Sequence, residues 1–248
     1  MMENLKNSLH MVKQGKGGVG KSYVAVLTAQ FLKAKTERLI CADTDPVNAT
    51  FTKYKSLDVA PVQIVEGGNI LQAKFDPLMV SVLENEAAFV IDNGAATFLP
   101  LMHYSKANGL YAAIKESGKN VYIHTVLFGG SAKQDTYSGL MELIESVGDD
   151  AKIVVWENER EGKIDFDGMS IREDRKFKEA VKAGKIAGIV NIADRRHDDT
   201  FTAAVKKMHE RSMTLSDVNA SPDFNFFEKR RLGIVVNEIF AGLDQVNW

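Results

Sequence analysis

The fold of this 248-residue chain is decided by residues 14–23, QGKGGVGKSY. The stretch holds four glycines and two lysines, and it lies between an apolar segment at residues 9–13 and a helix-forming segment at residues 21–35. Residues 15–22 fit the pattern G-x-x-x-x-G-K-[ST], in which successive backbone N–H groups turn inward around phosphate oxygens. We therefore predict a strand, a phosphate-binding loop and a helix, in that order.

We expect this loop and the start of the helix to bind the phosphates of a nucleotide. Lys21 can reach the β- and γ-phosphates, and the Ser22 hydroxyl can ligate Mg²⁺. The glycines give the backbone its freedom to turn, and the helix N-terminus adds partial positive charge. The predicted nucleotide-binding residues of this segment are Gly15, Lys16, Gly17, Gly18, Val19, Gly20, Lys21, Ser22 and Tyr23.

The rest of the chain alternates apolar strands with helical patterns. The predicted strands are residues 38–42, 62–65, 87–91, 121–127, 152–156 and 188–193, and the predicted helices are residues 77–85, 110–117, 134–147, 171–183 and 201–210. Strands that are apolar throughout indicate a mostly parallel sheet with helices on both faces, a doubly wound α/β fold. We expect one domain over residues 1–248, with a charge-rich surface loop near 157–176 and a C-terminal helical segment near 224–245.

Composition narrows the class of protein. Hydrophobic residues make up 45% and charged residues 26%, which is typical of a globular protein, and the net charge of -2 argues against a protein that wraps nucleic acid. The single cysteine, Cys41, excludes an intrachain disulfide and suits a reducing cytosol. The first residues lack the apolar core of a signal peptide, so we expect a cytoplasmic protein. His124 lies in an apolar strand and is expected to be a hydrogen-bonded core residue rather than a ligand.

The form K-G-G-x-G-K-[ST] resembles the deviant phosphate loop of the ParA/MinD group of P-loop ATPases. In that group the first lysine reaches across a nucleotide-sandwich dimer, so the resemblance implies this catalytic role for Lys16 and a homodimer in the ATP-bound state. The acidic turn DTDP at residues 43–46 is similar to a turn of the same group. There Asp45 corresponds to the residue that positions the attacking water, and Asp43 to one that holds Mg²⁺ through water. An ordinary Asp-Pro turn is the structural alternative.

Two further residues are assigned by the same resemblance, which implies ATP and Mg²⁺ as the ligands. Asp92 ends an apolar strand, where a metal-binding aspartate belongs, although the group commonly has proline after it and this chain has Asn93-Gly94-Ala95. A helix cap is the alternative for Asp92. Asn158 corresponds to the asparagine that reads the adenine edge, and a plain loop asparagine is the alternative.

Five stretches together are similar to the TraL proteins of conjugative plasmids, a ParA-like group that carries the DNGA variant. They are HMVKQGKGGVGKS, DTDPVNATF, FVIDNGA, FLPLMHY and IHTVLFGG, and the resemblance extends from His10 to about Asn158. It implies a slow ATPase, stimulated by a partner or by dimerisation, that acts as a switch in the positioning or assembly of transfer components. Conjugation proteins are the implied partners.

Several alternatives stay open from the sequence. A small plasmid-partition ATPase would bind DNA non-specifically, a nucleotide-binding recruitment module would not hydrolyse, and a P-loop kinase would need an acceptor pocket. The pairs Arg195-Arg196 and Lys206-Lys207 are either a DNA patch or solvated surface. The apolar stripe of the C-terminal segment either packs on the sheet or, with its basic residues, forms a peripheral contact to the inner membrane.

Overall fold

The structure, a computed structural model, describes residues 3–166 and 168–248 and is built on one large parallel sheet. The seven strands run in the order β3-β2-β6-β1-β7-β8-β9, and every neighbouring pair is parallel. They are β1 (Ser8–Val12), β2 (Leu39–Asp43), β3 (Val59–Pro61), β6 (Ala88–Asp92), β7 (Asn120–Phe128), β8 (Lys152–Asn158) and β9 (Ile186–Ile192). A separate antiparallel hairpin joins β4 (Val65–Glu66) to β5 (Asn69–Ile70). The predicted mostly parallel sheet is confirmed.

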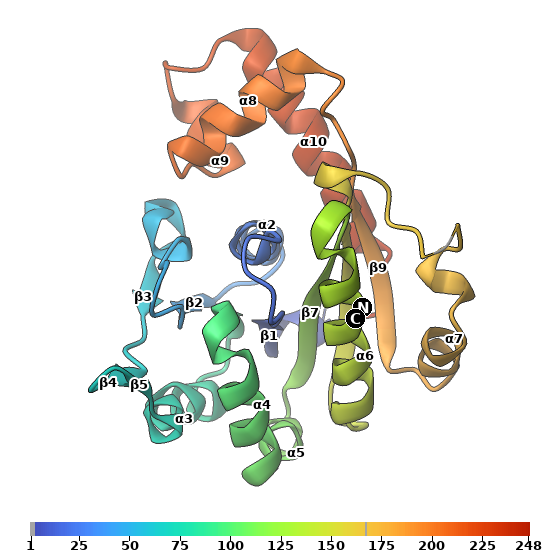
Figure 1. The fold of residues 1–248 in the computed structure, drawn as a ribbon. Helices are drawn as coiled ribbons and strands as arrows, with labels where there is room; N and C mark the ends of the chain where they lie inside the picture. The colour runs from blue at the N-terminus through green and yellow to red at the C-terminus, as the bar shows by residue number, and fades with distance from the viewer. Residues whose placement is uncertain (1–2, 167) are drawn as a thin grey trace.

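Helices cover both faces of this sheet (Figure 1). They are α1 (Glu3–Lys6), α2 (Lys21–Lys33), α3 (Asp76–Glu84), α4 (Phe98–Ala107), α5 (Leu110–Glu116), α6 (Lys133–Ser146), α7 (Arg175–Lys182), α8 (Asp199–Glu210), α9 (Leu215–Ala220) and α10 (Phe226–Asp244). One hydrophobic core packs α2 and α10 against the sheet, and a second core packs α3 to α7 against it. A third, smaller core joins α8, α9 and the first part of α10 into what we call the C-terminal lobe. The doubly wound arrangement is therefore confirmed.

Two predicted elements differ from the structure, and α4 is an element that the prediction missed. The strand predicted at residues 62–65 is wrong, because the sheet pairs β2 with Val59–Pro61, a short and partly exposed edge strand that contains a proline. Helix α4 was not predicted, since it is short and has Pro100 in its first turn, where proline is tolerated. The helix predicted at 171–183 is divided, because the Asp174 side chain caps α7 and ends the 3₁₀ turn before it.

A chain of hydrogen bonds crosses the buried middle of the sheet. Trp156 Nε1 donates to His124 Nδ1 over 2.9 Å, and His124 Nε2 lies 2.9 Å from His10 Nδ1. His10 Nε2 lies 3.0 Å from Ser8 Oγ, which donates to the Leu5 carbonyl over 2.7 Å. Because the indole can only donate, every later link must run in the same direction, with both imidazoles neutral and protonated at Nε2. The expectation of a hydrogen-bonded core histidine at 124 is confirmed.

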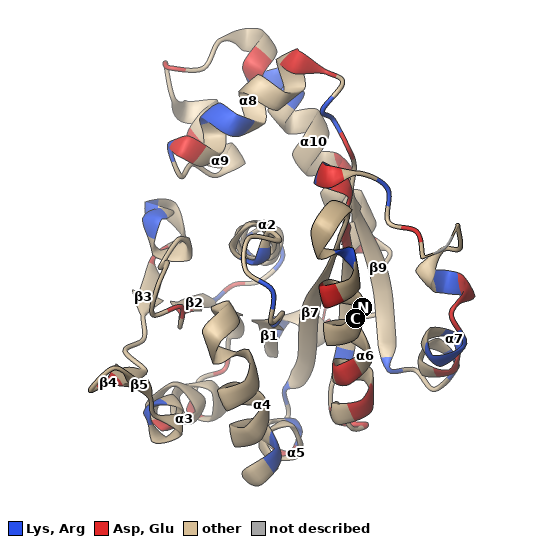
Figure 2. Ribbon diagram, in the orientation of Figure 1, with Lys and Arg blue, Asp and Glu red and all other residues tan. Residues whose placement is uncertain are grey.

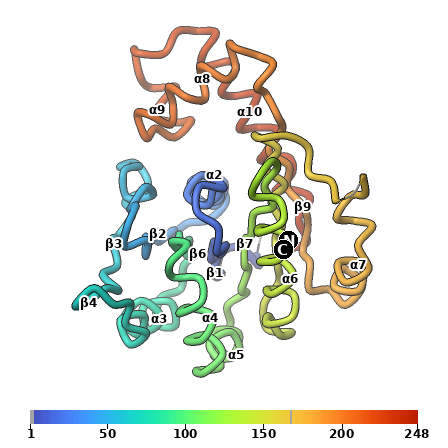
Figure 3. The backbone as a smooth tube through the Cα atoms, in the orientation of Figure 1, coloured from blue at the N-terminus to red at the C-terminus, as the bar shows by residue number. Residues whose placement is uncertain are grey.

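The last helix completes the core. Its apolar stripe, formed by Leu232, Val235, Val236, Ile239 and Leu243, is buried, so the packing alternative for this segment is correct. The two ends of the described part of the chain lie side by side (Figure 3), where Asn4 Nδ2 donates to the Trp248 carbonyl over 3.0 Å. Within the residues that the structure describes, no helix is both long and apolar enough to cross a membrane.

Candidate functional site

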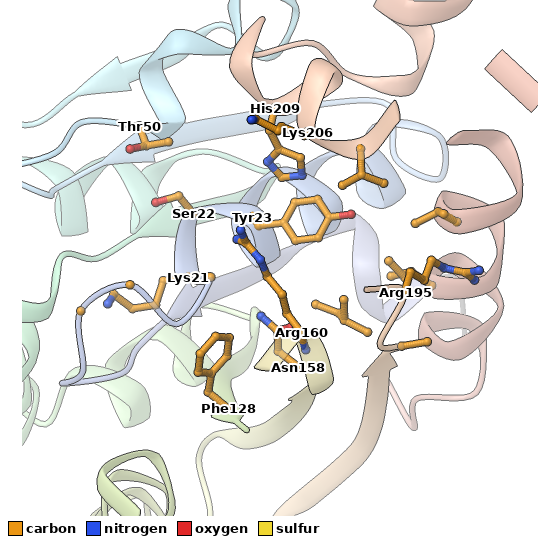
Figure 4. Close-up of a pocket in the computed structure, with 18 of the residues that line it drawn as sticks. Lys21, Ser22, Tyr23, Thr50, Phe128, Asn158, Arg160, Arg195, Lys206 and His209 are labelled. Atoms are coloured by element: carbon orange, nitrogen blue, oxygen red, sulfur yellow. Dashed lines mark hydrogen bonds between the residues drawn. The ribbon is translucent and has the colours of Figure 1, made fainter. Parts of the chain in front are cut away.

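The predicted phosphate loop opens into a large cavity at the carboxyl ends of the central strands, where doubly wound folds bind their ligands. The cavity measures about 1070 Å³ and lies between the loop and the C-terminal lobe (Figure 4). Its lining includes Lys21, Tyr23, Asp45, Asn158, Arg160 and His209. A site of this size can hold a nucleotide with room to spare.

Two glycines of the loop have backbone angles that favour glycine. Gly18 has φ of 78° and Gly20 has φ of 99°, in the left-handed region, and Gly20 is the residue from which α2 begins. A Cβ atom at Gly20 would also lie 2.8 Å from the Asn158 amide nitrogen. The loop conformation therefore depends on glycine at both positions.

Gln14 fixes the start of the loop, and sequence reasoning did not identify it. Its buried amide donates to the Val126 carbonyl over 3.1 Å and to the Thr136 carbonyl over 3.2 Å. Gly139 makes room for it, because a Cβ there would lie 2.5 Å from Gln14 Oε1. A glutamine before a phosphate loop has no distinctive pattern, so only the structure reveals that it ties β1 to β7 and α6.

Lys21 lies almost buried in the loop. Its ammonium donates to the Lys16 carbonyl over 2.8 Å, so the side chain folds back over the loop. Burial lowers the pKa of Lys21, and the carboxylates of Asp92 and Asp45 partly offset that effect. The charges of these two carboxylates therefore act on the Lys21 ammonium.

Lys16 takes a different direction from Lys21. Its ammonium pairs with the Asp135 carboxylate of α6 over 2.6 Å, and both side chains are about half exposed, at 44% and 57%. An ion pair this exposed contributes little to stability, about 0–1 kcal/mol. The side chain is thus held weakly at the rim of the site.

The turn after β2 is shaped by its two aspartates. Asp43 accepts from the backbone N–H groups of Asp45, Phe51 and Thr52, and it is buried. Asp45 Oδ1 accepts from the N–H groups of Val47 and Asn48 over 2.9 and 3.0 Å. Burial raises the pKa of Asp43, and these backbone donors counter the effect. The Asp45 side chain lies at the cavity wall.

Asp92 is the most unusual carboxylate of the site. It is 1% exposed, and among the described residues neither of its oxygens has a hydrogen-bond partner of normal geometry. Burial raises its pKa to about 7, an effect that the facing Ser22 hydroxyl and Lys21 reduce and that Asp43 and Asp45 increase. Orphaned buried carboxylate oxygens beside a phosphate loop suit a hard cation, which prefers oxygen ligands.

The residues present fit a magnesium ion held partly by the nucleotide. No group of three or more His, Cys, Asp or Glu side chains arranged for a metal occurs among residues 3–166 and 168–248. Magnesium commonly uses one or two protein ligands and substrate phosphates. Asp92 and Ser22 have the free oxygen atoms for this, whereas the Asp43 oxygens are already engaged by three N–H groups.

Asn158 is hydrogen-bonded to the phosphate loop. Its amide nitrogen donates to the Val19 carbonyl over 3.0 Å, and its oxygen accepts from the Arg160 N–H over 3.2 Å. The predicted role at an adenine edge stays a prediction, and in this conformation both ends of the amide are engaged. Deeper in the cavity, the Tyr23 ring meets the His209 ring at 4.4 Å, and burial lowers the pKa of His209 to about 4 (Figure 4).

The basic pairs at the cavity rim are largely neutralised. Arg195 pairs with Glu238, Arg196 with Asp194, Lys206 with Glu210 and Lys207 with Glu228. Figure 2 shows acidic and basic residues interspersed along α8. These pairings give the solvated-surface alternative more support than the DNA patch.

Comparisons with known proteins place this site in context. No family model matches the sequence. Two curated proteins from Escherichia coli, both named Protein TraL, are 35% and 38% identical to this chain over 236 residues, covering 95% of this chain and 97% of theirs. Among solved structures, the MinC:MinD cell division protein complex of Aquifex aeolicus superposes with a TM-score of 0.49 at 13% identity, covering 96% of each chain. A plasmid partition protein of Borrelia burgdorferi superposes with a TM-score of 0.43 at 13% identity, covering 84% of this chain and 96% of that one.

Proposed function

Because this chain belongs to the TraL family, with which it shares 35–38% identity over nearly its whole length, we propose that it is an ATP-binding, slowly hydrolysing switch of plasmid conjugative transfer. Dimers would form face to face around MgATP, and the ATP and ADP states would differ in their affinity for transfer components. Positioning or assembly of those components is the proposed task.

One observation supports the dimer more than any other. The phosphate loop carries its own phosphate-binding lysine, Lys21, while the Lys16 ammonium pairs with the half-exposed Asp135 of α6. A cation held this weakly at the rim is available to the phosphates of a facing subunit. Charge supplied there stabilises the negative charge that develops during phosphoryl transfer. Hydrolysis would then depend on association.

The other residues have distinct proposed roles. Lys21 and the loop N–H groups bind the β- and γ-phosphates, and Asp45 accepts a hydrogen bond from the attacking water and orients it. Ser22 and Asp92 would hold Mg²⁺, with Asp43 acting through water. When bound, the ion supplies charge neutralisation at the phosphates. Asn158 holds the loop through its hydrogen bond to the Val19 carbonyl.

The decisive test of this function is solution mass by light scattering with ADP and with MgATP. We expect a dimer of the wild type with ATP, accumulation of that dimer in Asp45→Ala, and monomers in Lys16→Ala. Asp45→Ala should lower hydrolysis by about a hundredfold or more, because the water loses its orienting group. If all three proteins stay monomeric at saturating ATP, Lys16 has no partner to reach and the dimer mechanism is wrong.

The pair between Lys16 and Asp135 gives a smaller, directional prediction. Asp135→Asn frees Lys16 and should strengthen the ATP-dependent dimer by up to about fivefold, since an exposed pair holds it with only ~0–1 kcal/mol. The dimer dissociation constant can be measured by analytical ultracentrifugation. Glu145→Gln is the matched control, because it removes another exposed acid of α6 that pairs with Lys176. A weaker dimer in Asp135→Asn would contradict the expectation.

A further inference from the structure

We propose that Asn93 and Thr44 are positioning residues that join the Asp92 turn to the Asp45 turn, so that the two turns move as one unit. The inference rests on the proposed function, because the position of Asp45 affects turnover only if Asp45 orients the attacking water. It concerns the residues that directly follow two predicted site carboxylates, Asp43 and Asp92, along the chain.

Asn93 ties three strand ends together with one buried side chain. Its amide nitrogen donates to the Val12 carbonyl at the end of β1 over 3.0 Å and to the Ile91 carbonyl of β6 over 3.3 Å. Its amide oxygen accepts from the Thr44 hydroxyl over 2.9 Å, just past the end of β2. Asn93 is 1% exposed, so these contacts are made without competition from water.

Thr44 completes the link from the other side. Its N–H donates to the Asp92 carbonyl over 2.9 Å, and its hydroxyl lies 3.1 Å from the same carbonyl and 2.9 Å from Asn93 Oδ1. One hydroxyl hydrogen serves both acceptors. Thr44, which lies between Asp43 and Asp45, is therefore hydrogen-bonded directly to the turn that carries Asp92.

Gly94 brings the second turn into contact with Asp45. A Cβ atom at Gly94 would lie 2.6 Å from Asp45 Cγ and 2.7 Å from Oδ1, although the backbone angles of Gly94 are ordinary. The Asp45 carboxylate thus rests on the Gly94 backbone while Val47 and Asn48 hold it from its own turn. Asn93-Gly94, the departure from the expected proline, supplies both the tie and the space.

These contacts link the position of Asp92 to the position of the Asp45 carboxylate. Asp92 faces the phosphate loop through Ser22 and Lys21, so a nucleotide that shifts Asp92 also shifts Asn93, Thr44 and the Asp45 carboxylate. Close-packed protein interiors transmit small displacements. The two turns are linked by side-chain amide and hydroxyl bonds that isosteric substitution can remove.

A double-mutant cycle tests the coupling. Thr44→Val keeps the shape and removes the hydroxyl, and Thr44→Ser keeps the hydroxyl as the matched control. We expect Thr44→Val to lower kcat by about tenfold or more with KM for ATP changed by less than about threefold, and Thr44→Ser to stay near wild type. In an Asp45→Ala background Thr44→Val should change kcat by less than about twofold, because its effect passes through Asp45. An equal loss in both backgrounds, or no loss in either, overturns the proposal.

Hydrogen exchange provides a second readout that does not depend on hydrolysis. Asn93→Ala is a second variant, which guards against misfolding of Thr44→Val. Hydrogen exchange of the segments containing residues 43–52 and 92–97 is compared with and without a non-hydrolysable ATP analogue. Wild type should respond in both segments, whereas Thr44→Val and Asn93→Ala should respond only in 92–97. Gly94→Ala should displace Asp45 and lower kcat without weakening nucleotide binding. If the wild type does not hydrolyse ATP, the proposed function fails, but the exchange experiment still tests the coupling between the two turns. The coupling is overturned if the exchange response of residues 43–52 is unchanged in both Thr44→Val and Asn93→Ala.

Discussion

Replacing Lys21 by alanine is expected to weaken MgATP binding by about a hundredfold or more. Two charge-assisted hydrogen bonds to phosphate oxygens contribute about 1.5–3 kcal/mol each, and a tenfold change in affinity corresponds to about 1.4 kcal/mol. The substitution also removes the positive charge that interacts with Asp92 and Asp45. These carboxylates then repel the incoming phosphates more strongly. Isothermal titration calorimetry at fixed salt measures the affinity.

The control for this prediction lies at the other end of the same helix. Lys33 is exposed and donates to the Ser56 carbonyl, so Lys33→Ala changes the charge of α2 without touching the loop. We expect its affinity for MgATP to stay within about twofold of wild type, because exposed charges at that distance are screened. If Lys21→Ala binds as tightly as Lys33→Ala, the loop does not bind phosphate through this residue.

Acid should destabilise the fold strongly through the buried histidines. In an unfolded chain histidine titrates near 6.5, whereas burial lowers the pKa of His124 to about 3 and lowers that of His10 well below its ordinary value, with His124 adding to the effect. Below pH 6.5 the unfolded chain therefore binds protons that the folded protein excludes. The unfolding free energy falls by about 1.4 kcal/mol per pH unit for each histidine, or about 5 kcal/mol for both between pH 6 and pH 4.

Other groups must be separated from this effect. The Asp92 carboxyl has the opposite sign, because its pKa of about 7 lets the folded protein gain a proton as the pH falls from 7 towards 4. His124→Gln isolates the histidine contribution, since glutamine can accept from Trp156 and donate to His10 but does not titrate. Urea unfolding between pH 6.5 and 4.5 should show a slope shallower by about 1.4 kcal/mol per pH unit in the variant. Parallel pH profiles would contradict the neutral histidine chain.

The sequence predicted the parts of this molecule that depend on local patterns. Residues 9–13, the loop and the following helix carry their signals within one short stretch, and the apolar strands at 87–91, 121–127 and 152–156 correspond to β6, β7 and β8. The edge strand β3 was misplaced, because it is three residues long, is partly exposed and contains Pro61, a residue type that argues against a strand. Pattern reading succeeds where burial on both faces of the sheet enforces it.

The supporting contacts of the site could not be read from the sequence. The partners of Gln14, Asn93 and Asp135 in these contacts lie between 49 and 122 residues away along the chain. A local sequence pattern therefore does not reveal the contacts that these residues make. Their roles depend on which strand ends the topology brings together. The carboxylates that they support are recognisable because they end apolar strands, whereas an amide that ties those ends has no such position-specific signal.

The buried hydrogen-bonded histidines also determine which part of this protein its tryptophan fluorescence reports on. The chain has two tryptophans, and the rings of Trp156 and Trp248 lie 6.0 and 6.2 Å from the His124 ring. Tryptophan fluorescence therefore arises from a single region, between β7, which carries His124, and the end of the chain. A change in tryptophan emission when nucleotide binds would show that the rearrangement reaches the buried middle of the sheet, and a constant spectrum would confine it to the loops at the strand ends.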